Sequence, residues 1–106
     1  ETDLSGTDLG GADLSKADLS KADLSKVNLW GSNLSEANLT RANLQGVNLL
    51  GASLTGANLS DANLRGASLH GADLTGATLK GIDLSEVDLT GTSLSGAIMP
   101  DGTIHP

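Results

Sequence analysis

The sequence predicts an all-β protein that coils as a β-helix, and three observations carry this prediction. Leucine occupies every fifth position from Leu4 to Leu94 without interruption, and Met99 and Ile104 continue the same register. A small or short residue stands two places before most of these leucines, and residues that favour turns follow them. Phe and Tyr are absent and Trp occurs once, so leucine and small residues must fill the interior in place of aromatic rings.

The five-residue spacing fits neither an α-helix nor a continuous strand. In an α-helix each residue turns by about 100°, so leucines five apart scatter around the cylinder. In a strand successive side chains point to opposite faces, so an odd spacing sends the leucines alternately to both sides. A turn within every pentad restores a single apolar side, because each repeat then begins again with its leucine facing inward. The chain is therefore expected to coil.

Each position of the pentad has an expected direction. The residue two before the leucine, such as Ala12 or Ala37, should point inward with it by period-two alternation. The Asp, Asn, Ser or Thr between them should point outward, and a Gly or a charged residue stands at the corner. Between coils Asp stacks mostly on Asn or Ser, which avoids repulsion between like charges. We interpret these acidic residues as parts of a polar ladder and not as acid–base pairs.

This A(D/N)LSG-like pattern resembles the pentapeptide-repeat family, of the near-consensus type common in cyanobacteria, over essentially the whole chain. The resemblance implies a right-handed quadrilateral β-helix (a solenoid) with four pentapeptides per coil. Columns of residues twenty apart agree with it. One corner column is Gly11, Gly31, Gly51, Gly71 and Gly91, and one inward column is Ala17, Ala37, Ala57, Ala77 and Ala97. We expect about five coils in a rod of about 24 Å, at the spacing of about 4.8 Å between stacked strands.

The two ends of the chain differ in sequence. We expect residues 1–101 to form the β-helix and residues 102–106 to form a C-terminal capping tail. Pro100-Asp101-Gly102 predicts a turn that removes an edge donor, and Ile104 is expected to fold over the last coil. The N-terminal end shows no cap, since Leu4 is in register from the start. We expect a domain of a longer protein in preference to end-to-end pairing at this open end.

One outward column departs from the pattern and is the candidate interaction strip: Trp30, Leu50 and His70, between Gly10 and Thr90. It adjoins the all-glycine corner, so two large apolar side chains should stand in solvent beside bare backbone. Trp is the residue most enriched in interface hot spots, which favours a binding surface. The alternative is that isolated apolar residues on a surface are ordinary, with Trp30 folding back over the glycine corner.

Composition and charge exclude several kinds of partner. The net charge is −7 and the isoelectric point is near 4.4, which argues against nucleic acid or an anionic membrane. No apolar run approaches the roughly 20 residues of a membrane span, so we expect a soluble protein, in the cytoplasm in preference to a lumen or the periplasm. A convex rod offers no concave site, so we predict no catalytic residue, no cofactor and no small-molecule substrate. His70 and His105 lie in different columns, which argues against a metal site.

The favoured function is a non-enzymatic scaffold whose partner is an unknown protein, or a second copy bound at the open N-terminal end. Some members of the family imitate DNA and inhibit type II topoisomerases such as DNA gyrase, and this is the alternative. A DNA mimic needs roughly three charges per coil of about 4.8 Å, whereas the coils beginning at residues 1, 22, 42, 62 and 82 carry −3, 0, −1, +1 and −4. Ice binding is a second alternative, suggested by the hydroxyl column of Ser15, Ser35, Thr55, Thr75 and Ser95. Ion pairs are expected between Lys16 and Glu36 and between Arg41 and Asp61.

Overall fold

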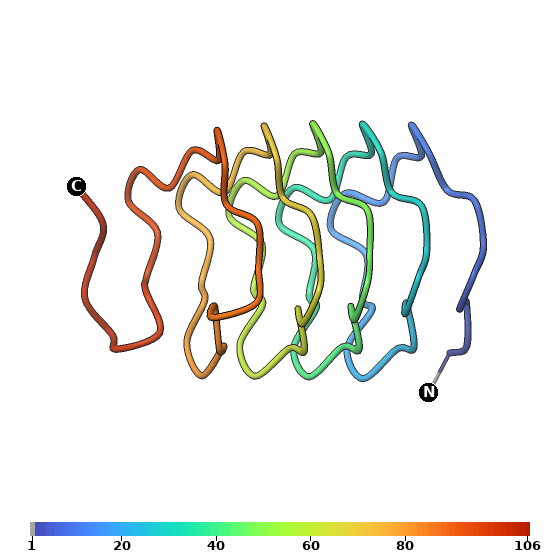
Figure 1. The fold of residues 1–106 in the computed structure, drawn as a ribbon, viewed down its shortest axis with the longest axis horizontal. Helices are drawn as coiled ribbons and strands as arrows, with labels where there is room; N and C mark the ends of the chain where they lie inside the picture. The colour runs from blue at the N-terminus through green and yellow to red at the C-terminus, as the bar shows by residue number, and fades with distance from the viewer. Residues whose placement is uncertain (1) are drawn as a thin grey trace.

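The structure, a computed structural model, describes residues 2–106 as a right-handed quadrilateral β-helix (Figure 1). The rod measures 34 Å along its axis and 25 by 23 Å across. Its axial length exceeds the expected 24 Å, because the C-terminal tail lies beyond the last coil (Figure 1). Within residues 2–106 there is no helix, and so none long and apolar enough to cross a membrane.

Successive coils are joined by parallel β-bridges between residues twenty apart, from Asp3–Asp23 to Thr78–Ile98. Every pentad except that of Asp83 contributes one bridged residue, and no strand in residues 2–106 is longer than this single residue. A twenty-residue period holds four pentads, which confirms the predicted coil. We number the faces by their first leucines: face 1 begins at Leu4, face 2 at Leu9, face 3 at Leu14 and face 4 at Leu19, each continuing in steps of twenty.

A tight turn closes every corner. The N–H of the inward residue donates to the C=O of the preceding leucine, as Ala12 does to Leu9 at 3.0 Å. At every corner from Gly6 to Gly96 except Glu86, the residue just before the donor adopts a left-handed backbone, for example Gly11 with φ of 71°. That conformation is the one a type II turn requires at its third position, and glycine adopts it without a steric penalty. The Gly-rich corners therefore follow from the geometry of the turn.

The leucines at every fifth position from Leu4 to Leu94, here called the leucine comb, form the core. From Leu24 to Leu79 every leucine of the comb is at most 1% exposed, and the small inward residues beside them are buried as well. At the two ends Leu4, Leu9, Leu14 and Leu19, and Leu84, Leu89 and Leu94, are only partly buried against this core. Burial thus depends on having a coil on both sides.

The tail turns back along face 4. Ile104 pairs antiparallel with Ile98, the N–H of His105 donates to the C=O of Ala97 at 2.8 Å, and that of Met99 donates to Thr103 at 2.7 Å. The expectation that Ile104 folds over the last coil is wrong, since its side chain is 70% exposed. The tail covers the hydrogen-bonding edge of face 4 and not the leucines of the core.

Candidate interaction surface

The outward Asp and Asn side chains fold back on their own pentads. Their Oδ1 atoms accept the N–H two residues on, as Asp13 accepts from Ser15 at 3.1 Å and Asn38 from Thr40 at 3.0 Å. A Ser or Thr at that position adds its hydroxyl, at 2.7 Å for Ser15. This is the Asx turn, in which a short side chain imitates the backbone. The spacing Asp/Asn-Leu-Ser/Thr would have predicted it, whereas the ladder interpretation alone did not.

The same bonds lower the pKa values of seven aspartates. In Asp73 the hydroxyl of Thr75 and then its backbone N–H hold the pKa below 3.8, against a small opposing effect of burial. The hydroxyl and N–H two residues on likewise lower the pKa values of Asp3, Asp13, Asp18, Asp88 and Asp101. For Asp83 the backbone N–H of Ser85 is the larger cause of the lowered pKa and its hydroxyl the smaller. Hydrogen bonds to the charged form favour it, so these carboxylates are ionised surface groups and poor general acids at neutral pH.

The strip residues Trp30, Leu50 and His70 stack in successive coils on the edge of face 2. The N–H of Gly31 donates to the C=O of Leu50 at 2.9 Å, and that of Gly51 donates to His70 at 3.0 Å, which sets the three in register. The Trp30 side chain is 56% exposed and that of Leu50 is 38% exposed, while His70 is also exposed. Trp30, Leu50 and Ile104 are the exposed large apolar residues of the described chain.

The glycine corner beside the strip is open. A Cβ placed on Gly11, Gly51 or Gly71 would meet no atom within 4 Å. The Trp30 ring therefore does not lie over the corner of either neighbouring coil. The corners next to the strip at Gly11 and Gly51 are therefore exposed backbone without a covering side chain.

Side-chain amides fix the backbone that carries the strip. The N–H of Trp30 donates to Oδ1 of Asn28, and that of Leu50 donates to Oδ1 of Asn48, both at 3.0 Å. These amides also form a short ladder, because Nδ2 of Asn28 donates to Asp8 at 3.0 Å and Nδ2 of Asn48 donates to Asn28 at 3.4 Å. The backbone that carries the strip is therefore held by side-chain hydrogen bonds in two successive coils.

The structure does not gather its charged groups into a reactive site. In residues 2–106 no group of three or more His, Asp or Glu side chains lies close enough to hold a metal ion. The one ion pair of these residues joins Arg65 Nε and Glu86 Oε2 at 2.6 Å, with both side chains largely in solvent. The expected pairs of Lys16 with Glu36 and Arg41 with Asp61 do not form within the described residues. The side chains of Glu36 and Asp61 lie instead against Gly56 and Gly81 of the following coil.

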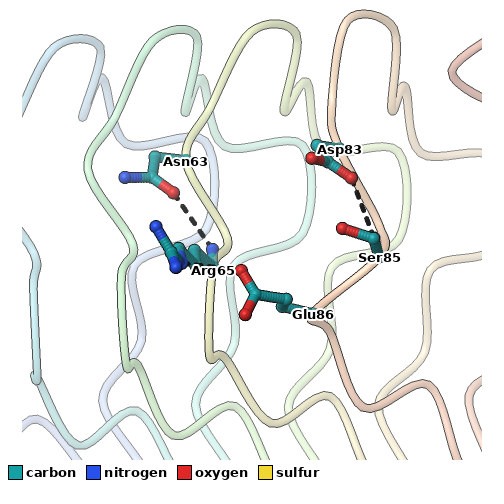
Figure 2. A network of polar contacts seen from close by, with 5 residues as sticks. All are labelled: Asn63, Arg65, Asp83, Ser85 and Glu86. Carbon is teal, nitrogen blue, oxygen red and sulfur yellow. Dashed lines mark hydrogen bonds and ion pairs between the residues drawn. The ribbon is translucent and has the colours of Figure 1, made fainter.

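A break in the ladder of face 1 was not foreseen from the sequence. The bridge between Asn63 and Asp83 is missing, and a cleft of about 300 Å³ opens between their coils. Figure 2 shows Asn63 bonded to Arg65 and Asp83 bonded to Ser85, each within its own coil.

Comparisons with known proteins agree with this architecture. A family model described as pentapeptide repeats matches residues 1–31, 32–71 and 67–101, in eight copies. A pentapeptide repeat protein from the cyanobacterium Cyanothece 51142 is 46% identical, with a TM-score of 0.80 over 81% of this chain and 58% of its own. One from the thylakoid lumen of Arabidopsis thaliana is 34% identical, with a TM-score of 0.76 over 98% of this chain and 69% of its own.

A more distant match shares the fold alone. A trypsin-treated variant of QnrB1, a plasmid-mediated fluoroquinolone resistance protein, is 20% identical, with a TM-score of 0.58 over 85% of this chain and 51% of its own. Among curated proteins no sequence matches. The chain thus spans only 58% of the cyanobacterial structure that it resembles at 46% identity.

Proposed function

This chain belongs to the pentapeptide repeat family, and from that premise we propose that it is a non-enzymatic scaffold that binds a protein through the Trp30–Leu50–His70 strip. The observation that carries the proposal is the 56% exposed indole on a rigid edge beside open glycine backbone. Trp contributes more binding energy than most residues when it enters a partner's pocket.

The shape of the strip indicates the chemistry of the partner. Three side chains stacked at about 4.8 Å form a ridge about 10 Å long and one residue wide. Such a ridge buries less than the roughly 1,200 Å² of a stable interface, so it fits a small, transient contact and not a permanent dimer. The two coils that carry Trp30 and Leu50 have net charges of 0 and −1. We therefore propose a different protein with a narrow apolar groove, bounded by polar groups that match the amides of Asn28 and Asn48.

Because Trp30 is the only aromatic residue, its fluorescence reports on this surface alone. The free protein should emit as a solvent-exposed indole, and a groove that encloses the ring should shift the emission to shorter wavelength. Proteins captured from a lysate of the source organism are compared for the wild type, Trp30→Ala, Leu50→Ser and the control Thr90→Ala. Support requires a protein that only the wild type and the control retain, and that shifts the Trp30 emission when purified. Identical capture by all four chains would contradict the proposal.

Self-association is a separate proposal, in which a second copy of the chain binds at the first coil. Leu4, Leu9, Leu14 and Leu19 are only partly buried there. A second copy stacked on this coil would cover them without touching the strip. Light scattering over a concentration series of wild type and Trp30→Ala separates the two surfaces. Dimers that form equally well in both chains indicate the first coil, whereas a monomer at all concentrations would contradict self-association.

Inhibition of gyrase by DNA mimicry and ice binding are weaker alternatives. The similarity to QnrB1 extends to the fold and not beyond it, and the middle coils lack the roughly three charges per coil that DNA presents. The hydroxyl column does not present a free surface, since Ser15 and Thr75 donate their hydroxyls to Asp13 and Asp73. A gyrase supercoiling assay and a thermal-hysteresis measurement, both expected to show no effect, test these alternatives.

A further inference from the structure

The face 1 segment 81–86 leaves the regular ladder of the rod. Among the leucines from Leu4 to Leu79, every one except Leu64 donates its N–H to the next coil, as Leu44 does to Asn63 at 2.7 Å. The N–H of Asp83, which the pattern directs to the C=O of Ala62, also has no backbone partner there. Two hydrogen bonds of the regular ladder are therefore absent beside the cleft, which is lined by Ala62, Leu64 and Asp83.

At the corner of this segment the hydrogen-bond register between coils shifts by one residue. Gly46 donates its N–H to Arg65, nineteen residues on, whereas Gly66 donates to Glu86, twenty residues on, at 3.0 Å. Glu86 is also the only corner residue between positions 6 and 96 whose φ is not positive. The segment remains attached at its two ends, by Asp61 to Lys80 at 2.9 Å and by Leu69 to Asp88 at 3.0 Å.

The side chain of Ile82 explains why this segment and no other is displaced. The inward column of face 1 holds Ala22, Ala42 and Ala62 before it reaches Ile82, which is buried at 4% exposure. An isoleucine over a column of methyl groups overfills the interior, and overpacking shifts the backbone. The smaller Val87 lies over Ala67 on the next face, where the bridge between Ser68 and Asp88 is intact. Glu86 is not the cause, because Glu36 adopts the left-handed corner with φ of 59°.

We propose that residues 81–86 form a flap with two states, the open state described above and a closed state in the regular register. Closing restores two ladder bonds, Leu64 N–H to Asp83 C=O and Asp83 N–H to Ala62 C=O, and moves the Gly66 N–H from the C=O of Glu86 to that of Ser85. Opening relieves the crowding of Ile82. It also leaves Glu86 outside the left-handed conformation, and the Glu86 carboxylate then pairs with Arg65 (Figure 2). The tail pairs with face 4 and leaves the outer edge of face 1 free, so it does not lock the flap.

Amide hydrogen exchange measured residue by residue by NMR tests the flap in the intact chain. In the wild type the amides of Leu64 and Asp83 should exchange at least about tenfold faster than those of Leu44 and Leu69. Ile82→Ala should slow Leu64 to the rate of Leu44. Val87→Ala removes a similar volume from the next face and should leave the Leu64 rate unchanged. A Leu64 amide as protected as Leu44 in the wild type would overturn the proposal.

A second variant, Glu86→Gly, tests the flap independently in case Ile82→Ala does not fold. Glu86→Gly keeps the core intact, favours the left-handed corner and removes the ion pair, so it should also slow exchange at Leu64. Relaxation dispersion should show millisecond exchange at residues 63–66 and 81–86 in the wild type and less in this variant. Absence of dispersion in the wild type, or an unchanged Leu64 rate in Glu86→Gly, would show a fixed bulge and overturn the two-state flap.

Discussion

Six corner residues with side chains occupy a backbone conformation that L-residues avoid. Their φ angles lie between 59° and 61°, in Lys16, Lys21, Lys26, Glu36, Arg41 and Asp61. A Cβ in this region costs about 1 kcal/mol, which the greater freedom of unfolded glycine partly offsets. These six residues place charges on corners that would be uncharged backbone if every corner were glycine.

Lys16→Gly is therefore expected to raise the free energy of unfolding by about 0.5 kcal/mol. The gain arises because glycine removes the steric penalty of the left-handed corner. Urea unfolding followed by circular dichroism measures it, with Lys16→Ala as the control that removes the charge but keeps the Cβ. Equal stability of the two variants would contradict the conformational explanation.

Ser32 is the one buried polar residue of the core, at 1% exposure, and its Oγ has no hydrogen-bond partner in the described chain. Ala12 and Ala52 occupy the same inward column. Because an unsatisfied buried hydroxyl is destabilising, Ser32→Ala should stabilise the rod by about 1 kcal/mol. Ala52→Ser should create the same defect one coil away, and thermal unfolding compares both variants. A loss of stability in Ser32→Ala would indicate a partner for this hydroxyl.

The aspartates make stability depend on pH in a defined direction. Because the hydroxyl and N–H of Thr75 lower the pKa of Asp73 below 3.8, its contribution is present above that value and lost as the pH falls through the folded pKa. Asp73→Asn keeps the Asx turn without the charge, as Asn33 and Asn38 do. We expect the variant to lose less thermal stability than the wild type between pH 5 and about pH 2. Parallel curves for the two proteins would contradict this assignment.

At the scale of the coil, position along the rod decides what a leucine contributes. Leu54 is fully buried between two coils, whereas Leu89 is only partly buried at the end of the core. Leu54→Ala should cost about 3 kcal/mol of unfolding free energy, and Leu89→Ala about half as much, because a half-open site leaves a smaller cavity. Chemical denaturation of both variants measures the difference, and equal losses would mean that the last coil is packed as tightly as the middle.

The elements divide into those that the sequence predicts and those that it does not. Leu4 to Leu94 predict the coil and its core, because one side chain per pentad determines which side faces inward. The flap could not be predicted in this way, because the sequence Ile82-Asp83-Leu84-Ser85-Glu86 fits the pentad pattern as well as the neighbouring pentads do. The break depends on the volume of Ile82 relative to Ala62 in the coil below, which a repeat pattern does not measure. Likewise the outward path of Ile104 depends on pairing with Ile98.

At the scale of the whole molecule, the register predicted which residues form the strip but not how they are held. Trp30 and Leu50 were placed in one column by their spacing of twenty, and the structure stacks them there. The amide bonds from Asn28 and Asn48 that fix their backbone were not foreseen. They depend on Asx turns, which the alternation of Asp and Asn between coils does not reveal.

A rod built from nearest-neighbour contacts should tolerate an added coil. Repeating residues 42–61 once adds a complete coil of net charge −1 and preserves every column. Because each coil stabilises its neighbours, we expect the longer chain to fold and to melt at a higher temperature than the wild type. Scanning calorimetry measures this, and a lower melting temperature would contradict a stability that adds coil by coil.

The twenty-residue period also limits how such a gene can change length. A duplication of one pentad after Trp30 would leave the leucine comb unbroken, yet it would carry Leu50 and His70 a quarter of the way round the axis, onto another face. Only insertions of twenty residues, or multiples of twenty, conserve which side chains are neighbours on the surface. Two repeat lengths therefore matter in this protein: a five-residue period maintains the interior, and a twenty-residue period maintains which side chains are neighbours on the exterior.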